Sequence, residues 1–393
     1  MFIAEIDLVA YAHPWDIPFD QRLAMMMAGT PRAAYFYSRP DTSTFRYRAY
    51  NVAQSLSVGR RGAAAWFTEN DIDRIGRVLD NCDVLVLCRN SLYNERVARI
   101  ASQARARGKP ILFDVDDLVF DPSYIHLLMD TLDQDANDDP ALNYWFSYVG
   151  RVSATLGLCD GVIATNTVLA ARARAFTGKP AHVIRNALNR EQQDISERIW
   201  DAKVRSDWAQ DGRRHLGYFS GSPSHNRDFR LVSGPIAELM DTHPDLHLRV
   251  VGYLDGVPEL TRHRDRIELI PMTDFINLQR EIGSVEVNLV PLLDNAFTNC
   301  KSELKWFEAA IVGALTAASP IHSYHGVIEH GRTGWLSPAH RWQPTLKEII
   351  AEVLENPRSH LRMLEETRAA ALDRFGWDRQ ADHIADALFA GIR

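Results

Sequence analysis

One strand–helix–strand unit in the second half of the chain constrains the fold more than any other stretch. The apolar run at 285–293 (VEVNLVPLL) predicts a buried strand, and the short run at 314–320 predicts another. A polar loop and a helical segment at 299–313 separate the two runs, so the unit is typical of a parallel sheet. Ligands of such sheets bind at the carboxyl ends of strands and against helix N-termini, which makes this segment the first candidate site.

Charged side chains mark the first turns of the predicted helix. If it starts near Ser302, then Lys301, Lys305 and Glu308 lie on roughly one side of it. Two cations and a carboxylate beside free backbone N–H groups suit a phosphorylated, sugar-bearing ligand. The same spacing also fits a solvated helix face with an ordinary Lys–Glu pair, and spacing alone gives the two interpretations equal weight.

The rest of the chain alternates apolar strand runs with helices in two series. The first series fills residues 1–190 and the second begins near 214, after a polar segment of helical pattern at 191–213. This alternation predicts an α/β protein of two doubly wound, Rossmann-like domains facing a central cleft. We assign residues 1–190 to the first domain, 191–213 to a linker and 214–375 to the second domain.

Composition excludes several classes of protein. The 393 residues are 46% hydrophobic and 24% charged, which is ordinary for a globular protein, and the net charge of −7 gives no bulk positive field for nucleic acid. The four cysteines show no CxxC spacing, which fits a reducing compartment and argues against a structural zinc site. No apolar stretch approaches the roughly 20 residues that span a bilayer. We expect a cytoplasmic protein, with peripheral contact at the inner face of the cell membrane left open.

Three carboxylates follow a predicted strand at 110–114. Asp114, Asp116 and Asp117 stand within four residues, and carboxylates this close raise one another's pKa unless a ligand or basic group pairs with them. Four roles fit them: divalent metal ligands, a phosphatase nucleophile, contacts to substrate hydroxyls, or a helix cap. Leu118 stands where phosphatases of the haloacid dehalogenase type have a small hydroxyl residue, which argues against the second role.

A loop of small residues follows the predicted strand at 215–220. Ser220 and Gly221 open it, and His225 and Arg227 come at its end. The backbone N–H groups of such a loop suit a phosphate, with help from Arg227. The loop lacks the Walker pattern GxxxxGK[ST], and no strand is followed by GxGxxG, which argues against a dinucleotide oxidoreductase.

The ordered set of motifs resembles the GT-B-fold glycosyltransferases related to glycosyltransferase family 4, in a branch found in bacterial polysaccharide and O-antigen clusters. The resemblance is strongest over about 215–380 and covers LGYF, HLRVVG, VNLVP, KSELKWFEAAIVG and GVIEHGRTGWL. VIATN and VIRN match the strand ends before the linker, and FRYR at 45–48 matches an acceptor-side loop. The resemblance implies an acceptor-side first domain, a nucleotide-sugar-binding second domain and a terminal helix in 376–393 packed back on the first.

The resemblance implies retaining transfer of a sugar from a nucleotide-diphosphate donor to a glycan, lipid-linked or other acceptor. In this family a Glu-x7-Glu motif precedes and enters the helix predicted at 299–313. Its second Glu, which holds the donor ribose, matches Glu308. Cys300 stands in place of the first Glu. Lys301 and Lys305 suit the diphosphate, without a metal or other cofactor. The expected catalytic residues are Asp116, Asp117 and Lys305, and the expected donor-binding residues are Ser220, Gly221, His225, Arg227, Lys301, Ser302, Leu304, Lys305 and Glu308.

Two other functions stay open at this level. Cys300, in place of the first motif acid, favours a non-catalytic GT-B accessory module of a glycan-synthesis complex. Asp114 and Asp116 leave a phosphatase as a weaker alternative. The partners that we expect are a nucleotide sugar and a saccharide or lipid-linked acceptor, not a nucleic acid.

Overall fold

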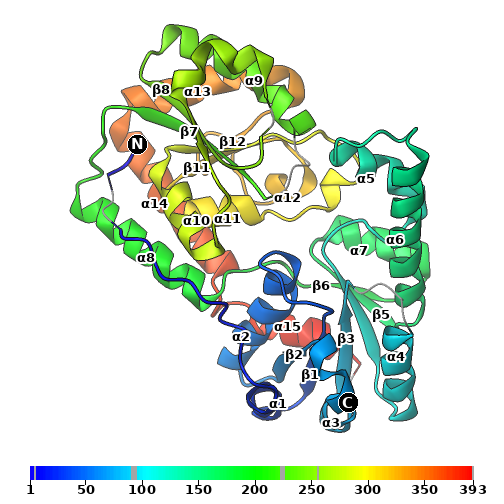
Figure 1. The fold of residues 1–393 in the computed structure, drawn as a ribbon. Coiled ribbons are helices and arrows are strands. Elements are labelled where there is room, and N and C mark those ends of the chain that lie inside the picture. Colours follow the sequence, from blue (N-terminus) through cyan, green and yellow to red (C-terminus); the bar gives the residue numbers. More distant parts are fainter. Residues whose placement is uncertain (4–5, 90–94, 222–225, 255, 392–393) are drawn as a thin grey trace.

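The computed structural model describes residues 1–3, 6–89, 95–221, 226–254 and 256–391. Within these residues the chain forms two six-stranded parallel sheets with flanking helices, and each sheet with its helices is called a domain here (Figure 1). No helix in the described part of the chain is both long and apolar enough to cross a lipid bilayer.

The first domain is built on the strand order β2-β1-β3-β4-β5-β6. Its central strands are buried nearly throughout, as expected for parallel strands covered on both faces. The strands are β1 (Arg32–Phe36), β2 (Ala63–Phe67), β3 (Val84–Cys88), β4 (Ile111–Val115), β5 (Gly161–Ala164) and β6 (Ala181–Val183). The helices are α1 (Phe19–Met27), α2 (Asn51–Val58), α3 (Ile75–Asn81), α4 (Arg96–Ala106), α5 (Ile125–Thr131), α6 (Asp139–Gly157) and α7 (Thr167–Thr177).

The second domain has the strand order β12-β11-β10-β7-β8-β9. It contains the predicted strand–helix–strand unit as β10, α11 and β11, with Val287 of β10 in register with Leu315 of β11. The strands are β7 (Arg214–Ser220), β8 (Leu246–Gly252), β9 (Ile267–Ile270), β10 (Val287–Val290), β11 (Leu315–Ala318) and β12 (Trp335–Leu336). The helices are α9 (Asn226–Thr242), α10 (Phe275–Ser284), α11 (Leu304–Ala310), α12 (His322–His325), α13 (Trp342–Glu355) and α14 (Pro357–Phe375).

Two further helices connect the domains. α8 (Arg190–Arg205) leads from the first domain to the second and packs against α10. α15 (Ala381–Leu388) follows the second domain in sequence but packs on α2 of the first (Figure 1). There the guanidinium of Arg61 donates to Asp386 at 2.6 Å. Counted from α1, the chain therefore passes between the domains twice, and its first residues also contact the second domain, where the Phe2 amide donates to the Ser284 carbonyl at 3.0 Å.

An apolar core continues from one domain into the other. The ring of Tyr47, from the first domain, lies edge-on to Phe307 of α11 with 6.2 Å between ring centres. Phe307 in turn stacks on Phe375 at the end of α14, with ring centres 4.8 Å apart. All three rings are buried, so the domains meet here through interior-like packing.

Candidate active site

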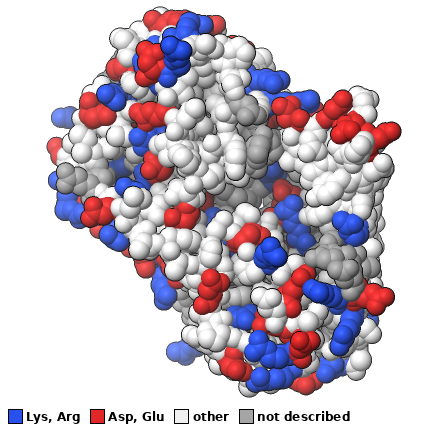
Figure 2. Space-filling view, in the orientation of Figure 1, with Lys and Arg blue, Asp and Glu red and all other residues white. Residues whose placement is uncertain are grey.

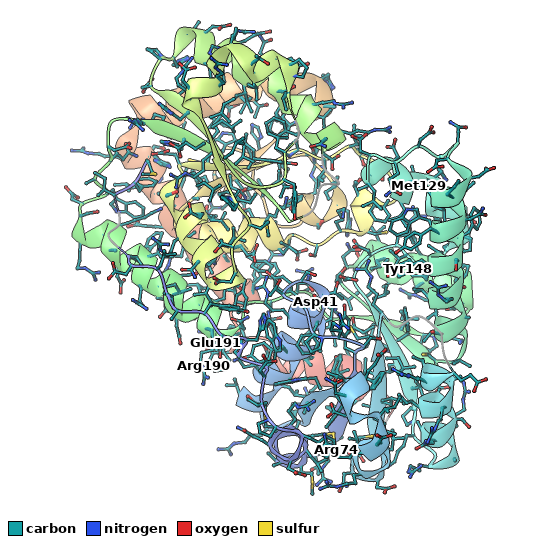
Figure 3. The ribbon with its side chains drawn as sticks, in the orientation of Figure 1. Asp41, Arg74, Met129, Tyr148, Arg190 and Glu191 are labelled. Atoms are coloured by element: carbon teal, nitrogen blue, oxygen red, sulfur yellow. The ribbon has the colours of Figure 1, made fainter. Side chains whose placement is uncertain are left out.

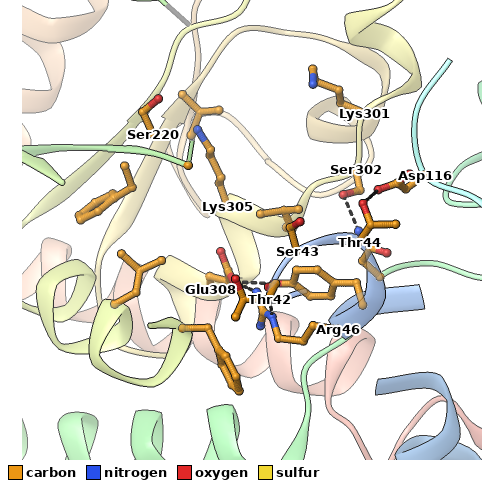
Figure 4. Close-up of a pocket in the computed structure, with 18 of the residues that line it drawn as sticks. Thr42, Ser43, Thr44, Arg46, Asp116, Ser220, Lys301, Ser302, Lys305 and Glu308 are labelled. Atoms are coloured by element: carbon orange, nitrogen blue, oxygen red, sulfur yellow. Dashed lines mark hydrogen bonds and ion pairs between the residues drawn. The ribbon is translucent and has the colours of Figure 1, made fainter. Parts of the chain in front are cut away.

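A cavity of about 490 Å³ lies between the two domains. The surface is hollowed between them in Figure 2, and Figure 4 shows the polar lining. The first domain contributes the loops that follow β1, β3 and β4, and the second contributes α11 and the loops that follow β7 and β9. These loops come from the carboxyl ends of parallel strands, where ligands of such sheets bind.

Two lysines form the cationic side of the cavity. Lys305 lies on α11, and the side-chain amide of Asn288 on β10 fixes this turn by donating to the Lys305 carbonyl at 3.0 Å. Lys301 lies in the preceding loop, with its Nζ 3.7 Å from a carboxylate oxygen of Asp117 across the cavity. Burial, reinforced by nearby Lys301, lowers the pKa of Lys305 to about 8. Lys305 is therefore charged at neutral pH and neutral in moderately alkaline solution.

Glu308 joins the two domains. The residue is 5% exposed, and its Oε1 accepts hydrogen bonds from the Tyr47 hydroxyl, from Gln192 at 2.9 Å and from Arg46 at 3.4 Å. Arg46 and Tyr47 belong to a π-helical turn, Arg46–Tyr50, of the first domain (Figure 4). Since all three donors bind Oε1, Oε2 is the oxygen that faces fewer protein donors among the described residues.

The loop before α11 is bound to the first domain. The side-chain amide of Asn166 donates to the carbonyls of Asn299 and Lys301, at 3.3 and 3.0 Å. Lys301 has an extended backbone, and α11 begins at Leu304, two residues after the predicted start at Ser302. The helix starts late because these carbonyls are held outside a helical conformation.

Cys300 packs into the apolar core of the first domain and does not line the cavity. Burial raises the pKa of its thiol to about 12, so the side chain is neutral at physiological pH. It therefore supplies neither the position nor the charge of the first motif acid.

On the first-domain side, Arg89 organises the acidic loop after β4. Its guanidinium donates to Asp116 at 3.0 Å and lies 3.6 Å from Asp117. Thr44 donates to the second oxygen of Asp116 at 2.6 Å (Figure 4). Tyr148 of α6, which is labelled in Figure 3, accepts from Arg89 at 3.2 Å. The basic partner expected for these carboxylates is thus present, and both Asp116 and Asp117 line the cavity.

Asp114 has a different environment from its two neighbours. It is fully buried and forms a two-pronged ion pair with Arg48, at 2.7 and 3.2 Å. Arg48 also donates to Asn186 at 2.9 Å. Burial, opposed by the Arg48 charge, raises the pKa of Asp114 to about 6. A carboxylate buried away from the cavity cannot attack a substrate there, which argues against the phosphatase alternative.

The loop after β7 reaches the cavity only in part. Ser220 and Gly221 line it, whereas His225 lies outside the described residues. The prediction that Arg227 contributes to the site is not met, because its guanidinium pairs with Asp130 and, at 2.7 Å, with Asp133. Asp130 of α5 and Asp133, just after this helix, hold the Arg227 guanidinium against the first domain.

The overall fold is similar to those of several solved structures. HepE of Anabaena, solved with UDP and glucose, aligns with a TM-score of 0.58 and 14% identity over 91% of this chain and 99% of that chain. Sucrose-phosphate synthase of Thermosynechococcus elongatus aligns at 0.55 and 15% over 90% and 96%, and a glycosyltransferase of Rickettsia africae at 0.56 and 12% over 91% and 98%. The chain has the GT-B fold. No protein-family model and no curated protein sequence matches it.

The GT-B cleft brings most of the predicted residues together. Those that line the cavity are Asp116, Asp117, Ser220, Gly221, Lys301, Ser302, Leu304, Lys305 and Glu308. The predicted fold class is therefore confirmed, whereas the roles of these residues stay predictions.

Several residues that shape the site are absent from the predicted set. Arg89 directly follows β3, and Asp116 follows β4. The sequence could therefore have indicated that both lie at the carboxyl edge of the first sheet. Gln192, in the predicted linker, has no such signal. Residues 45–48 resemble an acceptor-side loop of the family. In the structure the side chains of Arg46 and Tyr47 from this segment instead donate to Glu308.

Replacing Asp114 tests the buried ion pair. We expect Asp114→Ala to lower the free energy of unfolding by about 3–5 kcal/mol, because it leaves the Arg48 charge buried and unpaired. The matched control is Asp80→Ala, which breaks an exposed pair with Arg107 and should cost about 1 kcal/mol or less. Urea denaturation followed by circular dichroism measures both, and equal losses would contradict the assignment.

Proposed function

We propose that the protein is a retaining glycosyltransferase that transfers a sugar from a nucleotide-diphosphate donor to a glycan, lipid-linked or other acceptor in bacterial polysaccharide or glycoconjugate synthesis. One observation carries the proposal: Lys301, Lys305 and Glu308 of the second domain face hydroxyl and acidic side chains of the first across one cavity. The GT-B fold and the UDP bound in the solved structure of HepE support a nucleotide-sugar donor.

The two lysines suit the donor diphosphate. Negative charge develops on the leaving nucleotide diphosphate as its bond to the sugar breaks, and fixed cations in a partly dry site stabilise that charge strongly. Asn288 holds the backbone of Lys305 in place on α11, and Lys301 approaches from the adjacent loop. On this proposal the lysines act without a metal or other cofactor, and Lys305 is the catalytic cation.

Glu308 suits the ribose of the donor. Oε1 is already bound by Gln192, Arg46 and Tyr47, which fix the orientation of the carboxylate. Oε2 can then accept from ribose hydroxyl groups that enter the cavity. Ser220 and Gly221, at the end of β7, line the same side of the cavity as further donor contacts.

Asp116 and Asp117 suit sugar hydroxyl groups on the opposite wall. Arg89 and Thr44 orient Asp116, and Asp117 lies between Arg89 and Lys301. Carboxylates held in this way accept hydrogen bonds from several hydroxyl groups at once. On this proposal they position the donor sugar or the acceptor against the diphosphate.

A second candidate function is a non-catalytic accessory module of a glycan-synthesis complex. It is favoured by Cys300, which is buried, neutral and outside the cavity, so that the first acid of the family motif has no counterpart there. Such a module would use the same GT-B surface to bind a partner or a glycan rather than to turn over a donor.

A ligand screen separates these functions. With EDTA present, we expect one of UDP, GDP and dTDP to raise the melting temperature by mass action, and the matching nucleotide sugar to be hydrolysed slowly or transferred. A hundredfold excess of ligand over Kd corresponds to about 2.7 kcal/mol of added stability. Absence of binding by all three nucleotides would overturn the proposal, and binding without turnover would favour the accessory module.

Replacing Glu308 tests its contact with ribose. We expect Glu308→Ala to raise the Kd of the bound nucleoside diphosphate by about 10- to 100-fold, since a hydrogen bond to a charged group contributes about 1.5–3 kcal/mol. The Kd of inorganic pyrophosphate, which has no ribose, should stay unchanged. The control variant is Glu329→Gln, an exposed acid outside the cavity. Equal weakening of both ligands would contradict a ribose contact.

The pKa of Lys305 predicts how nucleotide binding depends on pH. The ammonium form that binds phosphate is lost as pH rises through about 8, so affinity should be highest below pH 8 and fall above it. The fall approaches about tenfold per pH unit. Lys305→Arg keeps its charge in this range and should remove the inflection. Calorimetric titrations from pH 6.5 to about 9.5 measure the effect, and a flat profile for the wild-type protein would exclude Lys305 as the phosphate contact.

A further inference from the structure

A second cluster of titratable side chains lies on the second sheet, at the amino ends of its strands. His215 of β7 is the register partner of His247 of β8, and Glu268 of β9 is the partner of Arg249, two residues after His247. Because side chains alternate along a strand, all three face one side of the sheet. They stand near the amino ends of the strands, whereas the GT-B cavity lies at the carboxyl ends.

The spacing of this cluster suits a metal ion. One ring nitrogen of each histidine and one carboxylate oxygen of Glu268 all lie within 4.8 Å of one another, among the described residues. The ligand atoms of a four-coordinate zinc ion at 2.0–2.1 Å stand roughly 3.3 Å apart. His215 Nε2 is already 3.0 Å from Glu268 Oε1, so shifts of about 1 Å complete the arrangement.

The His215 ring is buried within this cluster. Its side chain is 0% exposed, and Nε2 is the ring nitrogen that faces Glu268. In a neutral imidazole one nitrogen carries a lone pair, which Nε2 can present to a metal ion when Nδ1 holds the proton. The His247 ring lies alongside, with 5.1 Å between ring centres and 29° between the planes. Two such rings present nitrogen lone pairs to one small volume.

The ligand types, rather than the surrounding charges, favour a nitrogen-binding metal over a hard cation. Arg249 donates to Glu268 at 2.7 Å and to Glu281 at 3.0 Å, so part of the carboxylate charge is already neutralised. Arg213 and Arg266 also act on His247. Magnesium or calcium needs several oxygen ligands, which this cluster lacks, whereas imidazole nitrogen suits zinc and its neighbours.

We propose that His215, His247 and Glu268 form a binding site for one divalent transition-metal ion of the zinc type. The ion would tie together the amino ends of β7, β8 and β9, and glycosyl transfer at the opposite edge of the sheet would not use it. The cysteine pattern gives no sign of this site, because its ligands are two histidines and a glutamate on three different strands.

Metal titration of the full, untagged chain tests the proposal. After dialysis against EDTA and removal of the chelator, we expect the wild-type protein to bind one equivalent of Zn²⁺ and to melt at a higher temperature with it. His247→Ala, a half-buried position, should weaken binding at least about tenfold. His340→Ala removes an exposed histidine elsewhere and should behave like the wild-type protein.

Glu268→Gln provides a second variant, since glutamine keeps an acceptor for His215 but loses the charged ligand. It should also weaken Zn²⁺ binding, and it serves as the test variant if His247→Ala does not fold. Co²⁺ bound by the wild-type protein should show the visible absorption of a four-coordinate nitrogen-containing site. The proposal is overturned if the wild-type protein binds no Zn²⁺, or if the folded variants bind it as tightly as the wild-type protein.

Discussion

The contact of the Glu308 carboxylate with the first domain is the interaction on which the cleft depends. Three donors from the first domain and α8 meet on one oxygen of this side chain, directly behind the lysine that faces the cavity. The same turn of α11 packs Phe307 between Tyr47 and Phe375. One short helix thus provides both the apolar contact between the domains and the polar floor of the cavity.

The parallel sheets and the residues at their carboxyl edges were predictable because local patterns determine them. Apolar runs bounded by polar loops identify β10 and β11, and the loops that follow such strands meet at one edge. Asp116 could therefore be assigned to the carboxyl edge of the first sheet, and Lys301 and Lys305 to that of the second. That the two edges face one cleft was implied by the resemblance to GT-B glycosyltransferases. No local pattern indicates how the two domains pack against each other, so the sequence could not predict that Arg46 and Gln192 contact Glu308.

Competition between partners explains the remaining differences. Arg227 follows a loop suited to phosphate, but two acids from the other domain bind its guanidinium. Cys300 occupies a motif position, yet the first domain offers it an apolar pocket. Asp114 stands in the same cluster as Asp116 and Asp117, but it lies within β4, where it is buried against Arg48, whereas the other two follow the end of the strand. Each outcome depends on residues more than 60 positions away, which short sequence windows do not include.

The place of α15 has a consequence for how the chain is made. During synthesis the first domain leaves the ribosome well before the second, and domains usually fold in that order. Here α2 of the first domain stays uncovered until α15, beyond the whole second domain, has been translated. The first sheet can form early, but its outer layer is completed last. The nascent first domain therefore exposes the face of α2 that α15 later covers until translation is nearly finished.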